Sequence, residues 1–435
     1  MDNPQKIGNF RYRILGLLIY ATTVNYFDRS ILGVMSPTLM EHFNWSNTDY
    51  SYITIAFQAA YALGMLTMGG IIDRLGTRKG YVLSIGTWSI FGMLHATIGF
   101  LPKAMSLGAF SAARFGLGWG ESGHFPSAQK TVAEWFPKRK RAFATGLYNA
   151  ATSIGAIAAP LVVGAIVSTT AKNWQIPFLI TGGLSAIWVV LWLKIYRKPE
   201  EHPKLSKAEL EYIQSDSVVE SVEKTSWGKV LPKRQTWAFA IGKITDAVWW
   251  FYLFWAAIFL HDRFGVDIKH IGVPFIIMYL LADVGSISGG WLSGSFIKKG
   301  WSINKSRKIT LLICALALLP VSYVAFTDNQ WIAVVLIGFA AAGHQAWSAN
   351  LFTLVSDVFP KKAVASVTGI GGMMGAAAGI AAFFMLGKVL DAAGNTGFFW
   401  AFLVASVLYL ILLGVIQLLM PKMIPLDDNL KQVKN

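Results

Sequence analysis

Apolar stretches of membrane-spanning length follow one another along most of the chain, separated by short polar segments. About 20 apolar residues cross the hydrocarbon core of a bilayer as a helix. The stretch 52–72 meets this length with one strongly polar residue, Gln58, and several other stretches resemble it. The pattern predicts an all-α membrane protein with twelve transmembrane helices, at 14–38, 52–72, 80–101, 105–134, 142–168, 174–195, 236–261, 270–296, 307–327, 331–357, 363–389 and 397–420.

One hydrophilic segment, residues 196–234, divides the predicted spans into two groups of six. It is rich in Lys, Glu and Ser, and Ser206 with Glu209 has the spacing of a capping box that opens a short helix. We therefore expect a six-helix bundle over residues 1–195, a linker over 196–234 and a second six-helix bundle over 235–435.

The basic residues of the loops predict the topology. The loops after the second, fourth, eighth and tenth spans contain 14 Lys and Arg residues, whereas the loops after odd-numbered spans contain 5. Positively charged loops are retained on the cytoplasmic side. Both termini and the linker are therefore expected in the cytoplasm.

Composition narrows the class of protein. The 435 residues are 54% hydrophobic and 14% charged, and the mean hydropathy is +0.49, whereas about a quarter of a soluble domain is charged. The net charge of +15 comes from short basic runs between apolar stretches, so a nucleic-acid partner is not expected. We expect an integral membrane protein surrounded by lipid.

The sequence lacks the usual signatures of enzymes and cofactor sites. Cys314 is the only cysteine, and the seven histidines have no metal-ligand spacing, so neither a disulfide framework nor a metal site is expected. No phosphate-binding loop motif and no catalytic triad pattern occurs. We expect no cofactor and no catalysis, and therefore transport driven by a gradient. An anion channel is the alternative, distinguished by flux that does not saturate.

An internal repeat relates the two groups of spans. TrpPhePro at 135–137 and ValPhePro at 358–360 each lead through basic residues to a Thr-Gly pair, at an offset of 223. Two parallel, pseudo-symmetric halves are typical of one class of secondary transporter. The same offset places Glu121 opposite His344.

Among the ionisable residues inside predicted spans, six are candidates for a functional site: Asp28, Arg29, Arg114, Glu121, Lys243 and Asp246. A charge at the centre of a bilayer costs several kcal/mol unless a partner or a wet cavity receives it. We therefore expect a polar chamber to which both bundles contribute, and transport as the function.

In the first span, Asp28 and Arg29 point about 100° apart on a helix and cannot share one partner. One of them can serve as an anion receptor. The alternative is a structural ion pair that braces the first and fourth spans, for example Asp28 with Arg114. Glu121 is a candidate proton carrier because burial and a nearby arginine act on it in opposite directions. His124 is either a relay or a packed polar residue, and His344 leaves the same choice.

Further side chains are candidates for substrate binding. Lys243, which has Asp246 one turn away, is a second candidate receptor for an anion. Aromatic faces pack on sugar rings, and amides and hydroxyls bind sugar hydroxyls. The candidates of these kinds are Tyr61, Asn149, Trp249, Trp250, His344, Gln345, Trp347, Ser348 and Asn350.

Two glycine motifs have different interpretations. Gly118, Gly120 and Gly123 spell a dinucleotide fingerprint, but an apolar helix precedes them, so close helix packing is expected instead. The loop after the second span contains Gly69, Asp73, Arg74, Gly76, Arg78 and Lys79. We expect Gly69 to let helices approach closely and Asp73 to pair with basic residues across a cytoplasmic interface that opens and closes. The alternative is an ordinary positive loop.

This loop resembles the signature of the major facilitator superfamily. Within it, the chain resembles the anion:cation symporter family, which includes bacterial hexuronate and galactonate transporters. The segments that carry the resemblance are 26–29 (TyrPheAspArg), 60–61 (AlaTyr), 114–121, 134–137 (GluTrpPhePro), 343–346 (GlyHisGlnAla) and 356–360 (SerAspValPhePro). The last of these, together with 51–53 (SerTyrIle), is most similar to hexuronate (glucuronate and galacturonate) transporters.

The resemblance implies the major facilitator fold and proton-coupled uptake of a sugar acid. It also implies that the protein lies in the bacterial inner membrane and functions as a monomer. It implies that Arg29 binds the substrate carboxylate, that Asp28 and Glu121 carry protons, and that Arg114 couples to them. Tyr26 and Tyr61 match aromatic residues that line the site. Lys243 stands where hexuronate relatives resemble an arginine, which keeps the charge and loses bidentate geometry. The alternative substrate is another organic anion, such as an aldonate, aldarate, aromatic acid or dicarboxylate.

Overall fold

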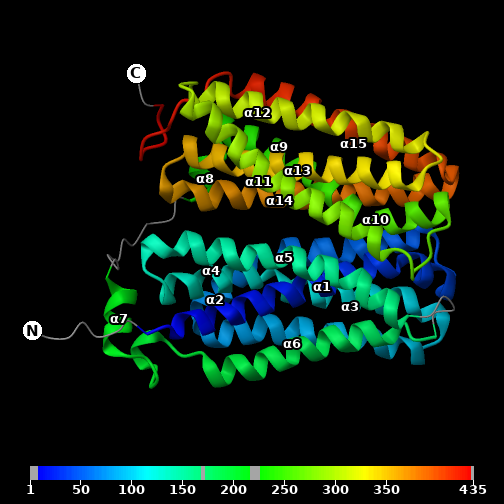
Figure 1. Ribbon diagram of the computed structural model, residues 1–435, viewed down its shortest axis with the longest axis horizontal. Coiled ribbons are helices and arrows are strands. Elements are labelled where there is room, and N and C mark those ends of the chain that lie inside the picture. Colours follow the sequence, from blue (N-terminus) through cyan, green and yellow to red (C-terminus); the bar gives the residue numbers. More distant parts are fainter. Residues whose placement is uncertain (1–7, 168–171, 216–225, 433–435) are drawn as a thin grey trace, which may run out of the picture. The chain divides into compact units, whose positions relative to one another are not determined.

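The structure, a computed structural model, describes residues 8–167, 172–215 and 226–432 (Figure 1). Residues 216–225 of the predicted linker and residue 168 of the fifth predicted span lie outside the described residues. The described part is almost wholly helical, with an isolated β-bridge between Leu426 and Gln432. Each of the twelve predicted spans coincides with helix, and the all-α prediction is confirmed.

The first six predicted spans correspond to α1 to α6. Their bounds are α1 (Phe10–Phe43), α2 (Asn47–Thr97), α3 (Lys103–Ser122), α4 (His124–Trp135), α5 (Lys138–Ile166) and α6 (Gln175–Ile195), with a 3₁₀ turn η1 (Ile98–Phe100). α2 contains the second and third spans, which separate at Gly76, where φ is 75° and ψ is 162°. A positive φ favours glycine, so Gly76 makes the turn between these spans. The fourth span is broken at Gly123, between α3 and α4.

The later elements begin with short helices of the linker. Their bounds are η2 (Pro199–Glu201), α7 (Lys207–Gln214), α8 (Trp227–Val230), α9 (Arg234–Gly242), η3 (Lys243–Thr245), α10 (Asp246–Phe264), α11 (Gly272–Lys298), α12 (Ile303–Leu318), η4 (Leu319–Ala325), α13 (Gln330–Val358), α14 (Lys361–Ala393) and α15 (Thr396–Leu419). The seventh predicted span is thus interrupted by η3, at the position of its two charged residues.

Contacts between residues divide the chain into two compact units. The first unit comprises Met1–Leu32 and Ala56–Glu220, and the second comprises Gly33–Ile55 and Ser221–Asn435. Helices α1 and α2 therefore each contribute to both units. These contacts place the linker helix α7 in the first unit. The bundle boundaries expected at residues 195 and 235 remain predictions.

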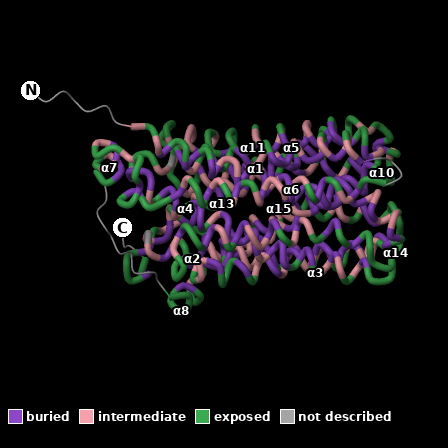
Figure 2. Tube along the Cα trace, turned by 90° about the horizontal axis from the view of Figure 1, so that it is seen from below, coloured by how far each residue is buried: buried purple, intermediate pink, exposed green. Residues whose placement is uncertain are grey.

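Apolar side chains cover much of the exposed helix surface. Buried and exposed residues alternate along the helices (Figure 2). On α11, Val284, Ile287 and Trp291 are 61%, 75% and 70% exposed. Their spacing of three and four residues places them on one helix face. Nine stretches of described helix are long and apolar enough to cross a membrane, and one of these, Asn47–Phe100, holds two predicted spans. An exposed apolar face on such helices is suited to lipid.

The glycine motif in α3 packs this helix closely against α2. A Cβ atom at Gly118 would lie 2.5 Å from the Phe57 carbonyl oxygen, and one at Gly120 would lie 2.7 Å from the Trp88 nitrogen. A Cβ at Gly123 would lie 2.8 Å from Ser84 Oγ. The interpretation of this motif as a packing element is confirmed.

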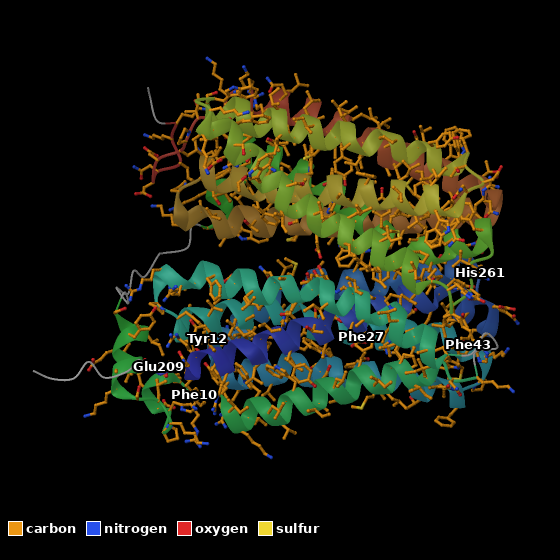
Figure 3. The ribbon with its side chains drawn as sticks, in the orientation of Figure 1. Phe10, Tyr12, Phe27, Phe43, Glu209 and His261 are labelled. Atoms are coloured by element: carbon orange, nitrogen blue, oxygen red, sulfur yellow. The ribbon has the colours of Figure 1, made fainter. Side chains whose placement is uncertain are left out.

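Half of the predicted capping box is present at α7. Ser206 Oγ accepts a hydrogen bond from the Glu209 backbone nitrogen at 3.2 Å. The Glu209 side chain, however, does not reach back toward Ser206. It reaches the start of α1, where Figure 3 shows it beside Phe10.

Candidate functional site

A buried ion pair joins α1 and α3 at the centre of the first unit. Arg29 Nη2 and Nε donate to Glu121 Oε2 at 2.7 and 3.0 Å, and both side chains are almost completely buried. The Arg29 guanidinium also lies over the rings of Tyr26, Phe57 and Tyr61, at 5.1, 5.5 and 4.9 Å from their centroids. Arg29 and Glu121 thus form an ion pair between the first and fourth spans. Any other anion that binds Arg29 has to compete with Glu121.

Asp28 faces the neighbouring helices of the same unit. Its Oδ1 accepts a hydrogen bond from Thr181 Oγ1 on α6 at 3.2 Å, and its Oδ2 lies 3.3 Å from where a Cβ of Gly92 on α2 would be. The fully buried Arg114 acts electrostatically on the carboxylates of both Asp28 and Glu121. Two acids and two arginines therefore form one charge cluster among α1, α2, α3 and α6.

Several polar atoms of the first unit are buried without a hydrogen-bond partner among the described residues. They include both amide atoms of Asn25 and of Gln58, Asp28 Oδ2 and Glu121 Oε1. Unpaired buried polar groups are uncommon and concentrate at functional sites. The sequence did not single out Asn25, although a carboxamide in an apolar span was a detectable signal.

His124 lies beside this cluster and joins three helices. Its Nε2 is 3.0 Å from Thr22 Oγ1 on α1, and its Nδ1 is 2.9 Å from the Tyr81 hydroxyl on α2. Both ring nitrogens are therefore engaged with hydroxyl groups, an arrangement that suits a packed polar residue.

In the second unit, the charged residues of the seventh span also pair. Lys243 Nζ lies 2.6 Å from Asp246 Oδ2 and 4.7 Å from the centroid of Phe352. His344 Nδ1 is 2.7 Å from the Tyr409 hydroxyl, and its ring stacks on Trp249 at 5.6 Å. The offset of 223 residues thus relates a buried acid in one unit to a buried histidine in the other.

The remaining candidate substrate residues differ in their surroundings. Asn350 Nδ2 donates to the carbonyls of Gly289 and Ala346, each at 2.9 Å, so both amide hydrogens hold α13 in place. Gln345 and Ser348 are half-buried on α13, and Asn149 is exposed on α5. No group of three or more His, Cys, Asp or Glu residues able to hold a metal occurs among the described residues.

The predicted gating loop pairs within its own unit. Asp73 Oδ1 lies 2.8 Å from Lys130 Nζ on α4, and Arg78 Nη2 donates to the Leu193 carbonyl on α6 at 2.5 Å. Arg74 is exposed. A Cβ at Gly69 would meet no heavy atom of the described residues within 4 Å, and the close approach of helices at Gly69 remains a prediction.

A half-buried acid that the sequence did not single out lies next to this loop. Glu134 on α4 accepts hydrogen bonds from the hydroxyls of Thr77, at 2.6 Å, and Tyr196. The offset of 223 relates Glu134 to Asp357 on α13, which pairs with Arg307 at 2.8 Å. Both units thus hold an acid at the same place in the repeat, immediately before the aromatic-Pro motif.

The helical fold and the buried charge clusters define a membrane carrier of the two-unit secondary-transporter class. The chain belongs to the Major Facilitator Superfamily, whose family model matches residues 18–383. It is an integral membrane transporter.

The chain is similar to curated sugar-acid transporters along most of its length. It is 33% identical over 402 residues to the hexuronate transporter of Escherichia coli K12, which covers 91% of each chain. It is 32% identical to the galacturonate transporter of Dickeya chrysanthemi, over 77% of this chain and 97% of that protein. It is 28% identical to a probable galactarate/D-glucarate transporter of E. coli K12, over 90% of each chain.

Solved structures support the fold. A bacterial homologue of the human lysosomal transporter Spinster matches with a TM-score of 0.76 at 18% identity, over 96% of this chain and 98% of that chain. A D-xylose-proton symporter matches with a TM-score of 0.75 at 14% identity, over 95% of this chain and the whole of that chain. At these identities the likeness concerns the fold alone.

Proposed function

We propose that the protein takes up a sugar acid, most specifically a hexuronate, by proton-coupled symport across the bacterial inner membrane. The relatives that are hexuronate and galacturonate transporters support this substrate class. The observation that carries the coupling is the Arg29–Glu121 pair, with Arg29 held beneath three aromatic rings.

The chemistry of coupling follows from this pair. A substrate carboxylate that binds Arg29 displaces Glu121 and leaves this acid buried without its closest counter-charge. An isolated buried carboxylate is strongly disfavoured, and a proton neutralises it. Substrate and proton therefore favour each other's binding.

The proposed roles follow the same logic. Arg29 receives the carboxylate, Tyr26 and Tyr61 pack on the sugar ring, and Asp28 and Glu121 carry protons under the influence of Arg114. Lys243, Asn149, His344, Gln345, Ser348 and Asn350 remain predicted substrate contacts. The cytoplasmic position of both termini and function as a monomer also belong to the proposal.

Uptake into proteoliposomes tests this function. Labelled glucuronate or galacturonate should accumulate faster when an inward proton gradient is imposed. Arg29→Ala should abolish accumulation, and Arg29→Lys should retain part of it, because lysine keeps the charge and loses the bidentate geometry. Arg13→Ala, an exposed arginine on the same helix, is the matched control. Uptake that ignores the gradient, or that survives in Arg29→Ala, refutes the proposal.

Substrates with two carboxylates are the second candidate, because one relative is a probable galactarate/D-glucarate transporter. Competition decides between them. Unlabelled galactarate that inhibits hexuronate uptake at lower concentration than glucuronate does would identify an aldarate carrier.

A further inference from the structure

Asn25 projects from α1 in a direction between those of Asp28 and Arg29. It is three residues before Asp28 and four before Arg29, so on a helix its side chain points about 60° from the first and about 40° from the second. Arg29 in turn holds Glu121 at 2.7 Å. Asn25 is fully buried, and its carboxamide is close enough to Glu121 to act on its charge.

The polar atoms on both sides of Asn25 lack hydrogen bonds. Among the described residues, neither Nδ2 nor Oδ1 of Asn25 has a partner, and Asp28 Oδ2 and Glu121 Oε1 are likewise unpaired. Each acid has its other oxygen occupied, by Thr181 and by Arg29 respectively. The unpaired atoms are thus one carboxamide and one oxygen from each acid, all within the same buried cluster.

A carboxamide is complementary to two carboxyl groups that share one proton. Its N–H donates to an ionised carboxylate, and its carbonyl oxygen accepts from a protonated carboxyl. Two ionised acids provide no donor for the carbonyl, and two protonated acids provide a poorer acceptor for the N–H. Asn25 therefore fits the singly protonated pair better than either alternative.

We propose that Asn25 is a positioning residue for proton coupling, which links Asp28 and Glu121 so that the two acids bind the coupled proton as one unit. This inference rests on the proposed function, since it requires that these acids carry the proton. The charged and titratable groups that face the pair are Arg29 from α1, Arg114 from α3 and, through these arginines, His124 and His95. The phenols of Tyr26 and Tyr61 lie on Arg29.

The test is the pH dependence of glucuronate binding to the purified full-length protein, followed by tryptophan fluorescence. In the wild type, affinity should fall as pH rises through one midpoint. Asn25→Leu should move this midpoint toward acid by about one pH unit, a tenfold loss of proton affinity, because the singly protonated pair loses its donor and acceptor. Asn25→Ser should move it less and in the same direction. In an Asp28→Asn background, Asn25→Leu should cause no further shift, because the pair no longer exists.

Gln58→Leu is the matched control, because Gln58 on α2 is also a buried carboxamide with both polar atoms unpaired. It should leave the midpoint where it is in the wild type. Unchanged midpoints in both Asn25 variants, or an equal shift in Gln58→Leu, overturn the inference and leave the proposed function intact. Wild-type binding that does not depend on pH refutes the proposed function instead. Asn25→Ser keeps the test decisive if Asn25→Leu does not fold.

Discussion

Glu209 holds the linker helix α7 on the first turn of α1, and removing its carboxylate should loosen that turn. Its two oxygens accept from the backbone nitrogens of Phe10 and Arg11, each at 3.1 Å, and from Arg11 Nη1 at 3.0 Å. The first N–H groups of a helix have no partner within the helix, so a buried acid here satisfies donors that otherwise stay unpaired. The Glu209 side chain is 1% exposed.

The size of the effect follows from these contacts. Removing one member of a buried ion pair costs about 3–5 kcal/mol. Arg11 keeps its hydrogen bond to the Gly8 carbonyl and its contacts with Tyr12 and Tyr212. We therefore expect Glu209→Ala to cost about 3 kcal/mol, the lower end of that range, which increases local opening about 100-fold or more.

Hydrogen exchange at the start of α1 measures this opening directly. Peptides that contain Phe10 and Arg11 should exchange about 100-fold faster in Glu209→Ala. Glu209→Gln should fall between this variant and the wild type, because the amide oxygen still accepts one hydrogen bond. Glu211→Ala, an exposed glutamate on the same helix, is the control. Exchange in Glu209→Ala that equals exchange in Glu211→Ala would show that the carboxylate does not hold α1.

Three further predictions concern a helix–helix contact, a capped helix end and a loop. Gly118→Ala should destabilise the protein by about 1–3 kcal/mol through overpacking. Gly108→Ala on the same helix should not, because a Cβ at Gly108 would meet no heavy atom of the described residues within 4 Å. Thermal unfolding of the two variants in detergent measures the difference. The Asp391 carboxylate accepts hydrogen bonds from the backbone nitrogens of Asn47 and Thr48 at 2.8 and 2.9 Å. Asp391→Ala should therefore destabilise the first turn of α2 by about 1 kcal/mol, and faster hydrogen exchange in that turn would show it. Slight burial acts to raise the pKa of Asp267, but hydrogen bonds from His270 and Lys269 outweigh burial and lower this pKa. The ionised carboxylate therefore stabilises the 265–271 loop above the ordinary pKa of about 4, and this stabilisation is lost as pH falls further. Hydrogen exchange in the loop should rise only in acid.

The helices and their order are predictable from the amino-acid sequence. Lipid requires long apolar segments whose backbone groups are bonded internally, so each span is visible as a local apolar run. Polar interruptions also have local causes: the break at Gly123, the turn at Gly76 and the 3₁₀ turn at 243–245 all fall where the pattern showed glycine or charge. The packing role of Gly118, Gly120 and Gly123 was predictable because small residues at these spacings let helices approach.

Which buried groups meet depends on how the helices pack. Asp28 and Arg29 are neighbours in sequence, but the helix turns them to different partners, Thr181 on α6 and Glu121 on α3. Three contacts depend on how helices far apart in sequence pack together. They are the hydrogen bonds of Arg29 to Glu121, the approach of Asn25 to Glu121 and the reach of Glu209 to α1. Periodicity specifies the direction of a side chain on its own helix, and it carries no information about which group the next helix presents to it.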